Sequence, residues 1–149
     1  MFSELHKRVK KAGEPPGTAI YTGKKSSSET LLTLLSYCEE SSNEKTGATL
    51  ESVFSSEKST GTTWLHVEGL QNVELIQQLA DKYQIHPLTV EDILNIDQRP
   101  KVEDFKNYLF ITFKMLIWSD QRNTFTTEQI SFVLGKNFLL SFQKKKNVW

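Results

Sequence analysis

The sequence predicts an α/β fold with α+β character, in which a mixed β-sheet has helices packed on its faces and ends in an antiparallel meander. Three observations lead to this prediction: short extended runs in the first half, two helical patterns in the middle, and three apolar runs near the end. Strands and helices in this order are typical of a sheet covered by helices. The 149 residues suffice for one compact domain.

Two extended runs near the start are predicted to be strands. Thr18 to Thr22 follows two prolines and a glycine and stops at Gly23. Thr30 to Tyr37 fits either a strand or a helix, because so short a run does not resolve its period, and a strand is favoured.

The next stretch, from Glu39 to Thr63, is rich in Ser, Thr, Glu and Lys. It is predicted to be loop with one short helix around Thr49 to Phe54. A clear strand, Thr63 to Val67, follows it.

Two helices are predicted in the middle of the chain. In the first, apolar residues repeat at steps of three and four, namely Val73, Ile76, Leu79, Ala80 and Tyr83. Asn72 is its expected N-cap. The second helix begins at Pro87, which suits the first helical position because its missing N–H is not needed there, and His86 is placed at the cap.

Three apolar runs form the predicted meander: Tyr108 to Trp118, Phe125 to Leu134, and Phe138 to Phe142, separated by the turn sequences SDQRNT and GKN. The first run is apolar at nearly every position instead of alternating. We therefore expect both of its faces to be covered and the sheet to lie between two layers.

Composition excludes several classes of function. Eighteen basic and eighteen acidic residues leave no net charge, and the basic runs His6 to Lys11 and Lys144 to Lys146 lie near the chain ends, so no nucleic-acid partner is expected. The single Cys38 excludes an internal disulfide and fits a reducing compartment. No signal peptide is expected, and no apolar run reaches the roughly 20 residues of a spanning helix.

Catalytic and nucleotide-binding motifs are also missing. The histidines His6, His66 and His86 share no helical face, so no histidine-based zinc signature is present. There is no glycine-rich phosphate loop and no GxSxG elbow. A catalytic triad assembled in space stays open from sequence alone.

One acidic pair, Glu91 and Asp92, lies in the middle of the second helix. Adjacent helical residues differ by about 100° around the axis, so the two carboxylates point in different directions but can line one helix edge. The residues alone favour a solvated acidic face, with an acid/base pair or half of a Mg²⁺ site as alternatives. Beyond the helix, a charged cluster of Arg99, Lys101, Glu103 and Asp104 is expected to be a polar connection with surface ion pairs.

Three stretches together, PPGTAIYTG, IHPLTVEDILNIDQRPKVEDFKNYLFITFKML and EQISFVLGKNFLLSFQ, resemble the cytoplasmic N-terminal domain of the CorA family of magnesium and cobalt transport proteins. The similarity covers roughly residues 13 to 143 in order. It implies a flexible segment 1–16, a CorA-like cytoplasmic domain 17–143, and a tail 144–149 that leads to a stalk helix and membrane region absent here.

The resemblance implies a function as well as a fold. In the family, subunits form homopentamers around a stalk helix, and a regulatory divalent ion sits between an acidic helix and an aspartate of a neighbouring stalk. Carried over, Asp92 becomes the principal ligand and Glu91 a second, mostly water-mediated one, with Mg²⁺ or Co²⁺ as the regulatory and transported ion. The expected location is the cytoplasmic face of the inner membrane, and this chain alone is expected to be a soluble fragment that binds divalent ions weakly and forms no stable pentamer.

Two other functions stay open at this point. A soluble hydrolase-like enzyme would use His86, Glu91 and Asp92 in a cleft, whereas a plain protein-interaction module would share the predicted fold. The favoured prediction is a non-enzymatic, cation-sensing regulatory domain. The physiological ion, whether Mg²⁺, Co²⁺, Ni²⁺ or Zn²⁺, is not determined by the residues.

Overall fold

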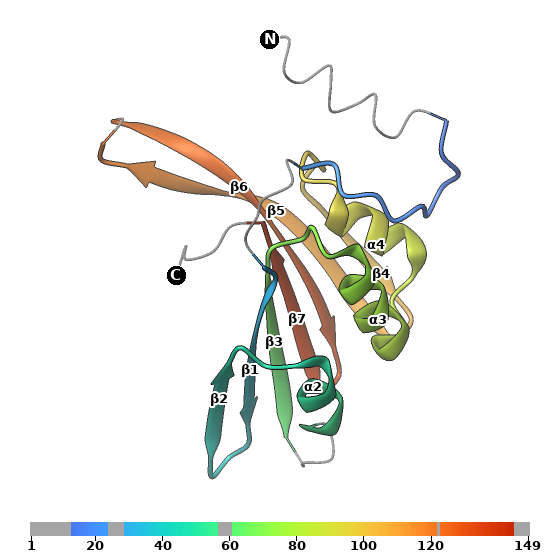
Figure 1. The fold of residues 1–149 in the computed structure, drawn as a ribbon, viewed down its shortest axis with the longest axis vertical. Helices are drawn as coiled ribbons and strands as arrows, with labels where there is room; N and C mark the ends of the chain where they lie inside the picture. Colours follow the sequence, from blue (N-terminus) through green and yellow to red (C-terminus); the bar gives the residue numbers. More distant parts are fainter. Residues whose placement is uncertain (1–12, 24–28, 57–60, 122, 145–149) are drawn as a thin grey trace.

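A computed structural model describes residues 13–23, 29–56, 61–121 and 123–144, and these residues form one mixed β-sheet with three helices (Figure 1). The strand order is β2-β1-β3-β7-β6-β5-β4. The strands are β1 (Leu31–Tyr37), β2 (Ser42–Thr46), β3 (Thr62–Glu68), β4 (Lys101–Phe105), β5 (Tyr108–Ser119), β6 (Thr124–Gly135) and β7 (Phe138–Gln143), and the helices are α2 (Leu50–Ser56), α3 (Val73–Tyr83) and α4 (Pro87–Leu94).

The pairing of the strands confirms the predicted mixed sheet. β3 and β7 are parallel, and the other neighbouring strands in the described sheet are antiparallel. The last three strands, β5, β6 and β7, form the antiparallel meander that the three apolar runs predict. The fold therefore has the expected α+β character.

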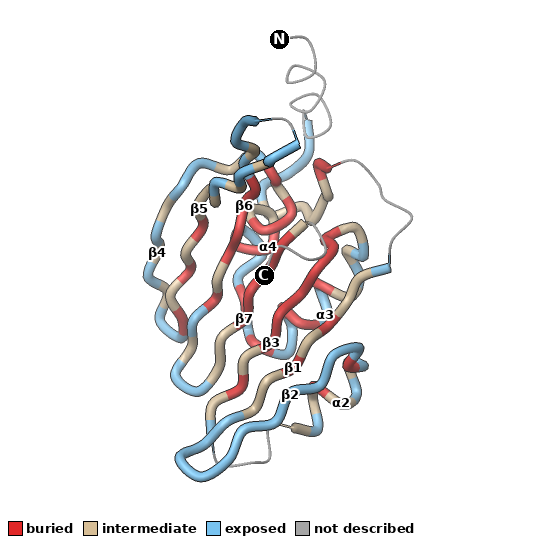
Figure 2. Tube along the Cα trace, turned by 90° about the vertical axis from the view of Figure 1, so that its left-hand side faces the viewer, coloured by how far each residue is buried: buried red, intermediate tan, exposed pale blue. Residues whose placement is uncertain are grey.

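The hydrophobic core lies between one face of the sheet and the helices. Strand residues that share this face by register include Leu65 opposite Leu140 and Phe110 opposite Val133. They pack in one cluster with buried residues of all three helices, namely Val53, Ile76, Leu79, Val90, Ile93 and Leu94. Figure 2 shows the buried positions concentrated along the central strands and the helices behind them.

Both predicted helix caps are present. The Asn72 side chain accepts a hydrogen bond from the Leu75 amide at the start of α3, and the His86 side chain accepts one from the Leu88 amide at the start of α4. Both caps use side chains within three residues of the bonded amide, which explains why the sequence alone located the helix starts.

The prediction of a strand at Thr18 to Thr22 is wrong. This segment is extended but runs beside the C-terminus of α4 instead of joining the sheet (Figure 1). The Thr22 amide donates to the Leu94 carbonyl at 3.2 Å, and its hydroxyl accepts from the Ile96 amide at 3.2 Å. The last carbonyls of a helix lack hydrogen-bond partners within the helix. The Thr22 amide therefore bonds the end of α4 and not a neighbouring strand.

Two strands were missed from the sequence. β2 falls inside the region predicted to be loop with one short helix, and all five of its residues are exposed, so it has no apolar alternation. β4 falls in the stretch predicted to be a polar connection, and it forms the edge of the sheet opposite β2, with Val102 exposed. The short helix predicted around Thr49 to Phe54 is confirmed as α2.

The expectation that both faces of the strand Tyr108 to Trp118 are covered fails at its far end. Leu116 is 66% exposed and Trp118 47% exposed, where the β5–β6 hairpin extends beyond the helices (Figure 1). The described helices pack into one core on one face of the sheet. They therefore do not form the layer that was expected on the other face.

The chain ends lie mostly outside this description. Residues 1–12, which include the basic run His6 to Lys11, and residues 145–149, most of the predicted tail, are not described. Within the described ranges, no helix combines the length and apolar character that crossing a membrane requires.

Candidate metal site

Helix α4 carries the acidic pair, and its first turn is held firmly against the sheet. The hydroxyl of Tyr108 on β5 accepts a hydrogen bond from the His86 amide at 3.0 Å and lies 2.9 Å from the hydroxyl of Thr89. Thr89 is fully buried, and Tyr108 nearly so. These bonds set the position and rotation of α4, and with them the directions in which Glu91 and Asp92 point.

The other end of α4 is held by Gln129 of β6. Its side-chain amide donates to the carbonyls of Asp92 at 3.3 Å and Asn95 at 2.9 Å. Its carbonyl oxygen accepts from the Gln98 amide at 3.0 Å, and Lys114 donates to the Ile96 carbonyl at 2.6 Å. A buried polar side chain thus satisfies the helix terminus and fixes the loop that leads to β4.

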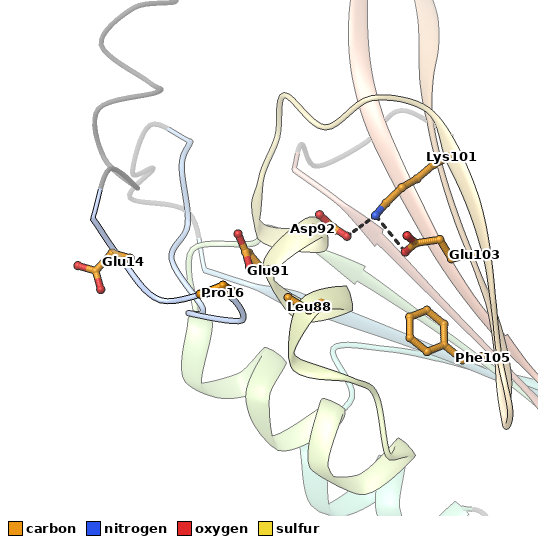
Figure 3. Close-up of a pocket in the computed structure, with 8 residues that line it drawn as sticks. All are labelled: Glu14, Pro16, Leu88, Glu91, Asp92, Lys101, Glu103 and Phe105. Carbon is orange, nitrogen blue, oxygen red and sulfur yellow. Dashed lines mark ion pairs between the residues drawn. The ribbon is translucent and has the colours of Figure 1, made fainter.

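A pocket of about 460 Å³ opens along the edge of α4 (Figure 3). Its walls come from residues 13–23, called here the N-terminal segment, from α4 and from the edge strand β4. Four carboxylates and one ammonium are among its lining residues, which are Glu14, Pro16, Leu88, Glu91, Asp92, Lys101, Glu103 and Phe105. The formal charge of this lining is therefore negative.

The Asp92 carboxylate points toward β4 (Figure 3). Oδ2 lies 2.7 Å from Nζ of Lys101, and Oδ1 accepts a hydrogen bond from the Gln98 side chain. Burial raises the pKa of Asp92 above its ordinary value, while the bond to Lys101 opposes this shift. The carboxylate is thus partly desolvated and already paired.

Glu91 points the other way, toward the N-terminal segment (Figure 3). Its Oε2 accepts a hydrogen bond of 2.7 Å from the amide of Gly17. The two carboxylates line one pocket but face different partners, as the rotation of about 100° between adjacent helical residues requires. The structure therefore brings the predicted residues to one site without placing them side by side.

Lys101 and Glu103 of β4 complete the site, and the sequence prediction did not assign them to it. Their charges lie 2.9 Å apart. Bonds to Asp92 and Glu103 outweigh the effect of burial on Lys101, so its pKa lies above the ordinary value. Residues two apart on a strand point to the same face. Had β4 been predicted as a strand, the spacing of Lys101 and Glu103 would have placed both side chains on one face.

The hydrolase-like alternative needs His86 beside the acidic pair, and the structure does not bring them together. His86 caps α4 and its ring stacks on Phe105, 5.9 Å between centroids, but it is not among the residues that line the pocket. No observation among the described residues favours that alternative.

Comparison with known proteins decides the family. The family model described as CorA-like Mg²⁺ transporter protein matches residues 59–149. The chain belongs to this family. It is also 39% identical over 135 residues to the cobalt/magnesium transport protein CorA of Thermotoga maritima, covering 91% of this chain and 38% of that protein. The chain thus spans well under half the length of this CorA relative.

Solved structures support the fold. The soluble domain of CorA from Methanocaldococcus jannaschii aligns over 77% of this chain and 41% of its own, with a TM-score of 0.54 and 16% identity. The full-length CmaX protein aligns over 83% of this chain and 38% of its own, with a TM-score of 0.59 and 12% identity. The sheet with its packed helices is therefore the fold of CorA-like soluble domains.

The donor set of the pocket suits a hard divalent cation. Mg²⁺ prefers oxygen ligands, retains several waters and often uses only one or two carboxylates, and Asp92 and Glu91 offer such oxygens. However, the described part of this CorA-like chain contains no group of three or more acidic, histidine or cysteine residues arranged to hold a metal. The pocket therefore offers carboxylate oxygens of the kind that a hard cation prefers, but no complete set of metal ligands among the described residues.

Proposed function

We propose that this chain is the cation-sensing regulatory domain of a CorA-like transporter for Mg²⁺ or Co²⁺, located on the cytoplasmic side of the membrane. One observation carries the proposal: four carboxylates and a single ammonium line one pocket along α4, beside the N-terminal segment and the edge strand. An excess of carboxylate oxygen in an open pocket favours a divalent cation over an anion or an apolar ligand. The names of the relatives are consistent with magnesium and cobalt as cargo.

The two predicted ligands have different roles in this proposal. Asp92, whose side chain is 14% exposed, binds the ion directly. Glu91 is held by Gly17 on the other side of the helix, so it acts mostly through water. A further aspartate, from the stalk helix of a neighbouring subunit, supplies the opposite side of the site.

The regulation follows from charge. In a homopentamer, carboxylates of adjacent subunits repel each other until a divalent ion neutralises them. High internal Mg²⁺ therefore stabilises the closed arrangement, and low Mg²⁺ releases it, because the ion binds the two assembly states with different affinity. The present chain contributes one side of this contact, so by itself it binds divalent ions weakly.

The test uses a full-length transporter that contains this domain. Asp92→Asn preserves the side-chain size and removes the charge, and it is expected to weaken the inhibition of ion flux by internal Mg²⁺. Asp104→Asn is the matched control, because Asp104 is an exposed residue of β4 that does not line the pocket. Inhibition by Mg²⁺ that is the same in both variants and in the unchanged protein would refute the proposal.

A further inference from the structure

The ammonium of Lys101 lies where a cation bound to Asp92 would lie. Nζ is 2.7 Å from Oδ2 of Asp92 and 2.9 Å from Oε2 of Glu103 (Figure 3). We propose that Lys101 is a built-in competitor for the divalent ion, so that the ion binds Asp92 only when the ammonium withdraws. This inference rests on the proposed function, because it concerns the same pocket.

Both carboxylate oxygens of Asp92 already have a hydrogen-bond donor beside them. Oδ2 is paired with Lys101, and Oδ1 accepts from the side chain of Gln98. Each oxygen keeps a second lone pair, but a metal ion that approaches Asp92 from the side of β4 competes with the donor that already lies there. Gln98 is neutral and carries no charge to repel the ion, so the decisive competitor is Lys101.

Charge makes the two cations mutually exclusive. A divalent ion bound to Oδ2 of Asp92 on the side of β4 would take the position that the ammonium now holds. Keeping both would place like charges a few ångströms apart in a partly buried setting, where the side chains of Lys101 and Asp92 are 29% and 14% exposed. Repulsion across so short a distance is poorly screened by salt.

The position of Lys101 allows it to withdraw. It extends from β4, the edge of the described sheet, on a flexible four-carbon side chain. Glu103 lies two residues further on the same strand and already contacts the ammonium. A lysine displaced from Asp92 thus keeps an opposite charge within reach, which lowers the cost of its release.

Competition sets the concentration at which the site fills. The apparent affinity of a ligand falls in proportion to the fraction of protein in the competent state. If the ammonium holds Asp92 for about nine-tenths of the time, removing it raises the affinity about tenfold. Lys101 would then tune the sensor toward higher ion concentrations without being a ligand itself.

The experiment measures Mn²⁺ binding to this chain by paramagnetic broadening of backbone amide signals, which detects weak and site-specific binding. In the Lys101→Gln variant, the signals around Asp92 are expected to broaden at about one-tenth of the Mn²⁺ concentration that the unchanged chain needs. Lys101→Arg keeps the charge and is expected to need the same Mn²⁺ concentration as the unchanged chain. Lys106→Gln removes an equal charge from an exposed position in the turn that follows β4 and is expected to match the unchanged chain.

Asp92→Asn separates this inference from the proposed function. If Asp92→Asn leaves the Mn²⁺ effect unchanged, the site is not at Asp92 and the proposed function fails. If Asp92→Asn removes the effect but Lys101→Gln binds no more tightly than the unchanged chain, the site stands and competition by Lys101 is overturned. Lys101→Met replaces the Gln variant should the latter lose its dispersed amide spectrum.

Discussion

The amide of Gly17 donates a hydrogen bond to Oε2 of Glu91 at 2.7 Å and joins residues 74 positions apart in the sequence. The same segment bonds the C-terminus of α4 through Thr22. Gly17 has a φ of +83°, and a Cβ at this position would lie 3.1 Å from Cβ of Pro87. The N-terminal segment is thus fitted closely along the helix that carries the site.

Gly17→Ala tests this fit. The left-handed backbone costs about 1 kcal/mol for a residue with a Cβ, and crowding against Pro87 adds about 1 kcal/mol or more. Gly13→Ala is the matched control, because Gly13 has a φ of +92° but nothing within 4 Å of a Cβ. Urea unfolding is expected to show the larger loss of stability for Gly17→Ala, and equal losses would contradict the close packing.

Tyr108→Phe removes the hydroxyl that holds the start of α4. The His86 amide loses its acceptor and the buried Thr89 hydroxyl loses its partner. Leaving buried polar groups unpaired costs about 1–3 kcal/mol, so the free energy of unfolding is expected to fall by this amount. Tyr37→Phe, at a position 48% exposed, is expected to change it by less than about 0.5 kcal/mol. A similar loss in both variants would show that the Tyr108 hydroxyl has no special role.

Phe110 and Trp118 lie eight positions apart on β5 and point to the same face, but only Phe110 is under the helices. Phe110→Ala is expected to cost about 3–5 kcal/mol, because it empties a fully buried site. Trp118→Ala is expected to cost about 1 kcal/mol, since the ring is half exposed and pairs chiefly with Phe125 at 4.8 Å between centroids. Calorimetric or urea unfolding of the two variants measures the difference, and comparable costs would mean that the hairpin end is covered.

His66 makes stability depend on pH. Its Nδ1 lies 2.7 Å from Oγ of Ser141, and burial lowers the pKa of His66 below 6.5, opposed by the charge of Glu68. Because the unfolded chain then binds the proton more readily, stability is full above about pH 6.5 and falls as the pH drops toward the folded pKa. His66 lines a pocket together with two carboxylates, Glu44 and Glu68. Of these, Glu68 raises the pKa of His66 and so opposes the effect of burial.

The measurement is urea unfolding between pH 5 and 7.5, with the His66 ring titrated directly by NMR. His66→Asn is expected to reduce the loss of stability at the acidic end of this range. A ring that titrates at or above pH 6.5 in the folded protein would disprove the assignment.

Local interactions explain what could be predicted from the sequence. The repeat from Val73 to Tyr83 and the caps at Asn72 and His86 depend on neighbours within a few residues, so α3 and α4 were identified with their starts. The position of Glu91 and Asp92 on one helix followed from the same local order. The apolar runs of the meander were equally clear, because burial of β5 to β7 requires apolar side chains.

The rest was decided by contacts between distant residues. β2 is exposed on both faces and β4 lies at the edge, so neither needs the apolar alternation that reveals a strand. Thr18 to Thr22 has the composition of a strand, yet its donor and acceptor groups bond the end of α4. Pairing of Asp92 with Lys101, and of Glu91 with Gly17, depends on where β4 and the N-terminal segment fold back. The sequence alone thus determined the helices, the meander and the acidic pair through short-range periodicity and capping, whereas tertiary structure chose the partners of each carboxylate, because those partners are brought together by long-range packing.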